Sequence, residues 1–186
     1  DCDTVADGTS AKVHPHRGGG GKRGPIETMR HIKTAVIGTG FMGKVHTEAI
    51  RRLGNVEVAM VAAENDELAA SFASQNSIPK VVTDYRQVLA VPEIEAVHIC
   101  TPNALHYPVS EAAMKAGKAV LCEKPLCMSV AEAQKMVDLA AKTSLPNCVN
   151  HNLRYYPATQ QIRRMIEHGD LGDILVPRRT AVVGAA

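Results

Sequence analysis

Apolar and polar positions follow two alternating patterns over residues 32–166 of the chain. Short, nearly continuous apolar runs predict strands that are buried on both faces, as in a parallel sheet covered by helices. Longer segments with apolar residues three to four positions apart predict helices between these strands. The predicted strands cover residues 32–37, 56–62, 80–82, 96–100, 119–122 and 147–150, and the predicted helices cover about 42–53, 66–75, 84–90, 105–116, 129–142 and 157–168.

Local signals place the ends of several of these helices. Gly54, Gly117 and Gly169 follow helical segments as C-terminal stops, and Ser129 with Glu132 has the spacing of a capping box. The repeated strand–helix alternation predicts right-handed crossovers, and therefore an α/β fold with a doubly wound, mostly parallel sheet. The predicted buried positions of the last two helices are Val130, Ala133, Val137 and Ala140 in one, and Ile162, Met165 and Ile166 in the other.

Three segments of different character divide the chain. Residues 1–30 include four consecutive glycines and no helical or strand period, so they are predicted to be a disordered extension. Residues 31–170 carry the regular pattern and form the predicted α/β domain. Residues 171–186 begin another apolar run at 174–176 and then end, which predicts a truncated start of a second domain.

Composition narrows the class of protein. The chain carries 21 Lys+Arg and 19 Asp+Glu, a net charge of +2, which is too balanced for an electrostatic nucleic-acid binder or a polybasic membrane-surface protein. Four Tyr, two Phe and no Trp disfavour a base-stacking platform. The five cysteines lack paired zinc spacings, and no apolar run approaches the roughly 20 residues of a membrane span. We therefore expect a cytoplasmic protein with reduced thiols, no metal site, and no membrane or nucleic-acid partner.

A glycine-rich turn follows the first predicted strand and opens the first predicted helix. In the run from Gly38 to Gly43, G-T-G-F-M-G, Gly38 permits the tight turn, Gly40 leaves room for a pyrophosphate, and Gly43 allows helix and strand to approach closely. Phosphate groups would then meet backbone N–H groups at the helix N-terminus. The motif in this context predicts a dinucleotide site.

An acidic residue about twenty positions further on would hold an adenosine ribose and disfavour a 2′-phosphate. That count reaches Ala63, and the acid is the next residue, Glu64. A one-residue offset leaves two alternatives: Glu64 reaches the ribose, or it points away and leaves room for the 2′-phosphate. The choice between NAD and NADP is therefore open at this point.

Polar residues also follow the fourth and fifth predicted strands, where ligands bind in open α/β sheets. Thr101-Pro102-Asn103 with His106 follows the fourth strand, and Glu123-Lys124-Pro125 follows the fifth. A lysine there can hydrogen-bond a substrate hydroxyl and stabilise a developing alkoxide. Lys124-Pro125 is also a candidate for a cis peptide bond. A third cluster, N-H-N-L-R-Y-Y-P over residues 150–157, lies between the last strand and the last helix.

These segments together resemble the glucose–fructose oxidoreductase/inositol dehydrogenase (Gfo/Idh/MocA) family. G-T-G-F-M-G, T-P-N-x-x-H, C-E-K-P-L, N-L-R-Y-Y-P and G-D-L-G-D-I occur in the family's order over about residues 32–174. The resemblance implies a Rossmann-like NAD(P)-binding domain over 31–170 and hydride transfer involving a sugar or cyclitol hydroxyl, with Lys124 as the catalytic residue. It also implies cofactor contacts from Gly38, Gly40, Phe41, Met42, Gly43, Glu64, Thr101, Pro102, Asn103, His106, Glu123, Lys124, Asn152 and Arg154.

Family members carry a second α+β domain that forms the substrate wall and the oligomer interface, and its signature includes an Asp and a His four residues apart. No D-x-x-x-H occurs in this sequence. We therefore expect the chain to be the cofactor-binding fragment of a sugar or cyclitol oxidoreductase that is inactive alone, with homo-oligomers formed only with the second domain. Two alternatives stay open: a nucleotide-binding module without turnover, and an NAD-dependent glycosidase of the same family.

Overall fold

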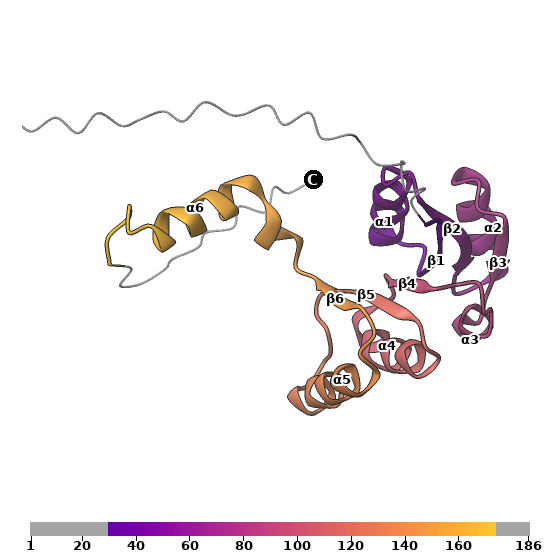
Figure 1. Ribbon diagram of the computed structural model, residues 1–186. Coiled ribbons are helices and arrows are strands. Elements are labelled where there is room, and N and C mark those ends of the chain that lie inside the picture. Colours follow the sequence, from indigo (N-terminus) through magenta and orange to yellow (C-terminus); the bar gives the residue numbers. More distant parts are fainter. Residues whose placement is uncertain (1–29, 174–186) are drawn as a thin grey trace, which may run out of the picture.

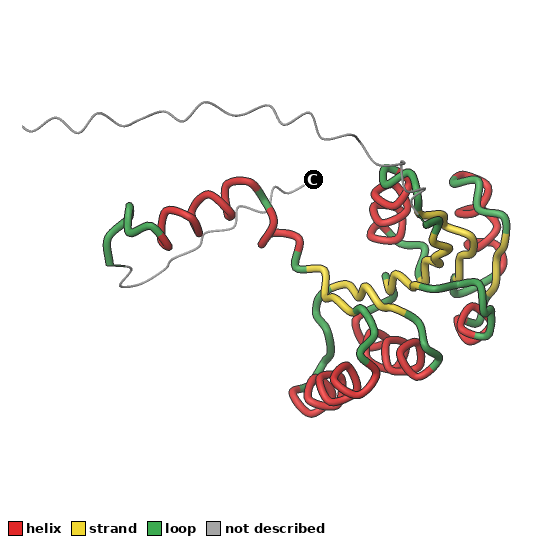
Figure 2. Tube along the Cα trace, viewed as in Figure 1, coloured by secondary structure: helices red, strands yellow, loops and turns green. Residues whose placement is uncertain are grey.

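A computed structural model describes residues 30–173 and shows one six-stranded, wholly parallel sheet with the strand order β3-β2-β1-β4-β5-β6. Helices cover both faces of this sheet (Figures 1 and 2). The predicted doubly wound α/β fold is therefore confirmed. The strands are β1 (Ile32–Ile37), β2 (Val56–Ala62), β3 (Lys80–Val82), β4 (Ala96–Ile99), β5 (Ala119–Glu123) and β6 (Asn147–Asn150).

The helices alternate with the strands, as the periodicity predicts. Polar side chains cap several of them: Asn65, Asp84 and Ser129 accept hydrogen bonds from backbone N–H groups of the helices that follow them. The helices are α1 (Phe41–Arg51), α2 (Asp66–Gln75), α3 (Tyr85–Leu89), α4 (His106–Lys115), α5 (Val130–Thr143) and α6 (Pro157–Glu167), with short 3₁₀ turns at η1 (Asn103–Leu105) and η2 (Asn152–Tyr155).

The core lies on both faces of the sheet, which explains the continuous apolar runs of its central strands. In β1, Ala35 and Ile37 point to one face and join the buried apolar side chains of α3, α4 and α5. Val36 points to the other face and packs with Ile50 of α1 and Phe72 of α2. Since successive strand residues face opposite sides, both sides must be apolar to be covered by helices.

The predicted buried faces of the last two helices are wrong in part. In α5, Ala140 packs against the core as predicted and Ala133 is half-buried, but Val130 and Val137 are 87% and 58% exposed, and Met136 enters the core instead. In α6, no residue is buried, and Ile162 is 52% exposed. Figure 1 shows α6 projecting from the α/β body, so its apolar stripe meets no core within residues 30–173.

The remaining predictions about organisation concern the ends of the chain. The predicted extension covers residues 1–30, of which the structure describes only Arg30. The predicted start of a second domain covers residues 171–186, of which the structure describes only 171–173. The rest of both predictions lies outside the described residues. Within residues 30–173, no helix is both long enough and apolar enough to cross a membrane.

Candidate functional site

The strand register brings the candidate motifs to one edge of the sheet. Ile37, the last residue of β1, pairs with Ala62 of β2 and Ile99 of β4. Further along the sheet, Glu123 at the end of β5 pairs with Asn150 at the end of β6. The glycine turn, Glu64, the Thr101 segment and Lys124 therefore all follow carboxyl ends of strands at the same edge, where open α/β sheets bind ligands.

Backbone packing explains two of the three glycines in the turn. Gly38 has a φ of +107°, and a Cβ there would lie 2.4 Å from the carbonyl oxygen of Cys100. A Cβ on Gly43 would lie 2.2 Å from the carbonyl oxygen of Gly38. These glycines permit the close approach of β1, β4 and α1, as the sequence motif predicts.

Gly40 has a different role, because a Cβ at this position would meet nothing within 4 Å. Its backbone is extended and it precedes α1 as the N-cap without a side-chain cap, and α1 has no acidic residue in its first turn. The first N–H groups of an α-helix have no partner within the helix, so this end of α1 offers donors to an anion. The space beside Gly40 is therefore available to a ligand, not occupied by the protein core.

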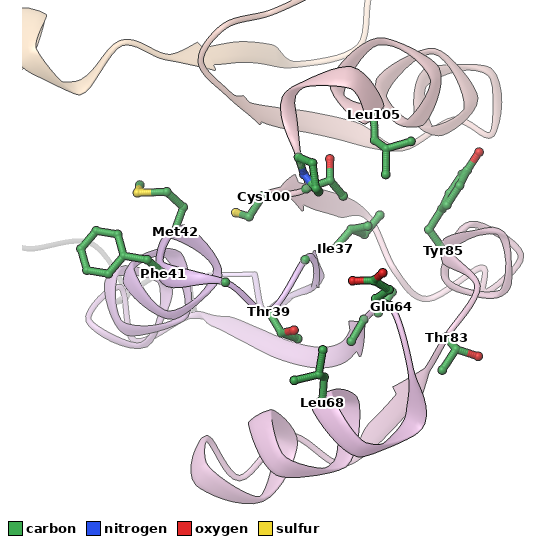
Figure 3. A pocket seen from close by; sticks show the side chains of 16 residues that line it. Ile37, Thr39, Phe41, Met42, Glu64, Leu68, Thr83, Tyr85, Cys100 and Leu105 are labelled. Carbon is green, nitrogen blue, oxygen red and sulfur yellow. The ribbon is translucent and has the colours of Figure 1, made fainter.

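A cavity of about 730 Å³ opens at this edge of the sheet. The glycine turn, the end of β2, Tyr85 of α3 and the segment after β4 surround it (Figure 3). The lining side chains are mostly apolar, and burial raises the pKa of the Cys100 thiol to about 12, so this thiol is neutral. The lining residues are Ile37, Gly38, Thr39, Gly40, Phe41, Met42, Ala62, Ala63, Glu64, Leu68, Thr83, Tyr85, Cys100, Thr101, Pro102 and Leu105.

Among the described residues that line the cavity, Glu64 is the one with a carboxylate. Ala63 is buried, and its amide donates to the carbonyl of Val82, so this position belongs to the end of the sheet. Glu64 is exposed, and Figure 3 shows its carboxylate directed into the cavity. Of the two alternatives left open by the sequence, this orientation favours contact with a ligand.

The segment after β4 contributes an unpaired polar atom. The hydroxyl oxygen of Thr101 is buried beside the cavity and has no hydrogen-bond partner within residues 30–173. Pro102 also lines the cavity, while Asn103 is exposed in η1 and does not line it. A buried hydroxyl without a partner carries a free-energy cost that a ligand hydrogen bond would remove.

His106 does not line the cavity. The side chain is 1% exposed, and its ring nitrogens lie 2.5 Å from the carbonyl oxygen of Pro125 (Nδ1) and 2.9 Å from that of Thr101 (Nε2). These contacts join the segment after β4 to the segment after β5. The structure therefore gives this predicted cofactor residue a supporting position between two loops.

Lys124 is exposed beyond the end of β5, and its side chain forms no ion pair or hydrogen bond within residues 30–173. The Lys124–Pro125 peptide bond is cis, as the sequence allows. Neighbouring Glu123 differs: it is 5% exposed and turns inward. Burial opposes ionisation of Glu123, but hydrogen bonds from Asn150, His46 and the Lys124 amide outweigh it and hold the pKa of this carboxyl below its ordinary value.

Asn152 and Arg154 lie in η2, at the base of the projecting helix α6, and both are exposed. Neither lines the cavity. The backbone carbonyl of Arg154 accepts from Gln160 of α6, which makes this segment part of the connection to that helix. The structure therefore does not bring these two predicted residues together with the glycine turn.

Sequence reasoning missed two site residues, His46 and His98. His46 lies within α1 and is 4% exposed, and His98 lies within β4. The ring nitrogen Nδ1 of each lies 3.0 Å from that of the other, and Nε2 of His46 lies 2.9 Å from Oε1 of Glu123. The sequence did offer a signal for His46. It lies four residues before Ile50 and therefore on the same helix face, which predicts that the histidine is buried against the sheet. Within residues 30–173, no group of His, Cys, Asp or Glu side chains is arranged to hold a metal ion.

The sheet order, the glycine turn and the cavity together define a Rossmann-type domain. Residues 32–151 match the Gfo/Idh/MocA family, described as an oxidoreductase family with an NAD-binding Rossmann fold, and the chain belongs to this family.

Several relatives are similar to this chain over about two fifths of their own length. Levoglucosan dehydrogenase from Pseudarthrobacter phenanthrenivorans is 36% identical over 160 residues, which are 82% of this chain and 41% of the relative. The 1,5-anhydro-D-fructose reductase of Ensifer adhaerens is 37% identical over 130 residues, 70% of this chain and 39% of the relative. A structure of levoglucosan dehydrogenase with NADH and levoglucosan superposes with a TM-score of 0.75 at 33% identity, covering 78% of this chain and 41% of that one. The chain thus spans about two fifths of the length of these relatives.

Proposed function

We propose that this chain binds NAD or NADP across the carboxyl edge of its sheet and forms the cofactor-binding part of an oxidoreductase that acts on a sugar or cyclitol hydroxyl. The observation that carries the proposal is the open space at Gly40 beside the uncapped N-terminus of α1, within a cavity of about 730 Å³. A cavity of this size suits a cofactor-sized ligand. The family's NAD-binding fold and the NADH in the related levoglucosan dehydrogenase structure support it.

The cavity residues fit a dinucleotide by their chemistry. The backbone N–H groups of Phe41, Met42 and Gly43 would hold the pyrophosphate at the positive end of the α1 dipole. The carboxylate of Glu64 would accept hydrogen bonds from the adenosine ribose, and the unpaired hydroxyl of Thr101 would meet a polar group of the cofactor. Phe41, Met42, Glu64 and Thr101 line the cavity, and the Thr101 hydroxyl has no other hydrogen-bond partner within residues 30–173.

At the far end of the site, Lys124 would face the nicotinamide and the substrate. A bound nicotinamide would supply the hydride chemistry. Lys124 would donate a hydrogen bond to the substrate oxygen, since a lysine is ordinarily a cation at neutral pH. Its exposed position and lack of an ion-pair partner within residues 30–173 leave it available for that contact.

The substrate class comes from the relatives. The two relatives described above are named for levoglucosan and 1,5-anhydro-D-fructose, both sugar derivatives. The second half of the site would come from sequence that these relatives have beyond the matched portion. A module without turnover and a glycosidase that uses NAD remain candidate functions of the whole protein. The free thiols of Cys100, Cys122, Cys127 and Cys148 suit a reducing compartment, and we place the protein in the cytoplasm.

Calorimetry with NAD⁺, NADH, NADP⁺ and NADPH tests the binding proposal. We expect the purified chain to bind at least one of these, and Gly40→Val to abolish binding, because the added methyl groups would occupy the space for the pyrophosphate. Ala70→Val is the matched control, since Ala70 is exposed on α2 and does not line the cavity. A folded sample that binds none of the four forms, or a Gly40→Val variant with unchanged affinity, would refute the assignment.

A further inference from the structure

Four polar side chains from four different elements meet behind Lys124. Oε1 of Glu123 (β5) accepts from Nδ2 of Asn150 (β6) and lies 2.9 Å from Nε2 of His46 (α1). Nδ1 of His46 lies 3.0 Å from Nδ1 of His98 (β4). Oε2 of Glu123 accepts from the backbone amide of Lys124 at 3.2 Å. We call these four side chains the His46 cluster.

The hydrogen positions in the His46 cluster follow from what each group can do. An ionised carboxylate only accepts, so Nε2 of His46 carries a hydrogen and donates it to Glu123. Nδ1 of His46 and Nδ1 of His98 face each other, so one of them carries the shared hydrogen and the other accepts it. Burial, with a smaller contribution from His46, lowers the pKa of His98 to about 4, in agreement with a neutral ring there. Nδ2 of Asn150 also lies 3.2 Å from Nε2 of His46, but it donates to Oε1 of Glu123, the acceptor that the two groups share.

The His46 cluster links the two ends of the candidate site. His46 belongs to α1, whose first turn lines the cavity at Phe41 and Met42. Glu123 holds the amide of Lys124, the residue at the other end of the site. None of the four side chains lines the cavity itself, so their effect on a ligand must pass through α1 or through Lys124.

We propose that His46 is a positioning residue: its hydrogen bond to Glu123 fixes the end of β5 and so sets where Lys124 presents its ammonium group. The inference rests on the proposed function, because it takes the nicotinamide end of the cofactor to lie near Lys124. A cation held there disfavours the positively charged ring of NAD⁺ relative to the uncharged ring of NADH. The ratio of the two affinities therefore reports the position of Lys124, and ADP-ribose, which has no nicotinamide, serves as the internal control.

The experiment measures the affinities of NADH, NAD⁺ and ADP-ribose by calorimetry for His46→Leu, His46→Gln, Lys124→Ala and the His46→Leu/Lys124→Ala double variant. We expect His46→Leu and Lys124→Ala each to lower the NADH-to-NAD⁺ affinity ratio at least threefold, with ADP-ribose affinity changed less than twofold. The NADH-to-NAD⁺ affinity ratio of the double variant should be no lower than that of Lys124→Ala alone, because both changes act through the same ammonium group. His46→Gln keeps an N–H donor for Glu123 and should restore most of the ratio, and His31→Leu, at an exposed position, should leave it unchanged.

Two outcomes separate the inference from the proposed function. If the unaltered chain binds none of the three ligands and neither NADP⁺ nor NADPH, the proposed function fails. If it binds them and His46→Leu leaves the ratio unchanged or acts additively with Lys124→Ala, the positioning role fails. Nitrogen-15 NMR of the histidine rings in the unaltered chain tests the cluster without any ligand or variant. It should show a hydrogen on Nε2 of His46, and an Nε2 without a hydrogen would overturn the inference.

Discussion

Lowering the pH from 6.5 to 4 is expected to destabilise the fold through His98. The unfolded chain takes up a proton on this ring near pH 6.5, whereas the folded chain does so only near pH 4, because burial and the facing His46 ring disfavour the cation. Between these values the unfolded state binds more protons, so the free energy of unfolding falls as the pH falls. A shift of this size corresponds to about 3 kcal/mol, fully lost below pH 4.

Urea denaturation at a series of pH values between 7 and 4 measures this loss. Glu123 contributes in the same direction, because its lowered pKa also makes acid unfavourable to the fold, so the comparison needs a variant that removes only His98. His98→Asn is suitable, since its side-chain amide can either donate to or accept from Nδ1 of His46, which faces His98. The free energy of unfolding of the unaltered chain should fall by about 1.4 kcal/mol per pH unit more than that of His98→Asn over this window. Parallel curves for the two proteins would show that His98 is not a buried neutral ring and would refute the reasoning.

Three further predictions follow from the site. Gly43→Ala should lower the free energy of unfolding by at least about 2 kcal/mol, because its Cβ would clash with the backbone oxygen of Gly38. Gly40→Ala should change the free energy of unfolding by less than about 1 kcal/mol, because a Cβ there meets nothing within 4 Å. Urea denaturation measures both changes, and equal effects would contradict the assignment of Gly43 to packing and Gly40 to the ligand space. NADH should bind at least about tenfold more tightly than NADPH, or by roughly 1.4 kcal/mol or more, because the carboxylate of Glu64 is directed into the cavity and would repel a 2′-phosphate. Equal affinities for the two cofactors, or a preference that Glu64→Ala leaves unchanged, would contradict the assignment of Glu64 to the ribose. The 186-residue chain should not reduce NAD⁺ or NADP⁺ with polyols or aldoses. Both ring nitrogens of His106 face carbonyl oxygens, and no D-x-x-x-H occurs among the 186 residues to supply a base. Absorbance at 340 nm measures the reduction, and reduction that Lys124→Ala abolishes would overturn the prediction.

Local patterns predicted much of the fold, because each strand of a parallel sheet covered on both faces must be apolar at consecutive positions. The run 32–37 had to be apolar on both faces, and Gly38 and Gly43 had to lack a Cβ, so these features are readable in a single short segment. The orientation of Glu64 was undecided in the sequence, because a one-residue offset at the end of a strand changes the direction of a side chain.

The features that the sequence did not predict depend on distant contacts. His46 and Asn150 are 104 residues apart in sequence. They meet because α1 packs on β4 as well as β1, and β5 and β6 follow β4 in the sheet. The exposed face of α6 has the same origin. Its spacing predicts an amphipathic helix, but spacing does not say whether any partner covers that helix within residues 30–173.

The contacts of His106 have a consequence for how the rim of the site moves. The His106 ring lies between the carbonyl oxygens of Thr101 and Pro125 and contacts both, so it connects two loops whose contact residues are 24 positions apart. Because both contacts are to main-chain oxygens, the side chains of these loops can vary without changing the contacts of His106. Thermal fluctuations of the two loops should therefore be correlated, and the rim should widen or narrow as a single unit.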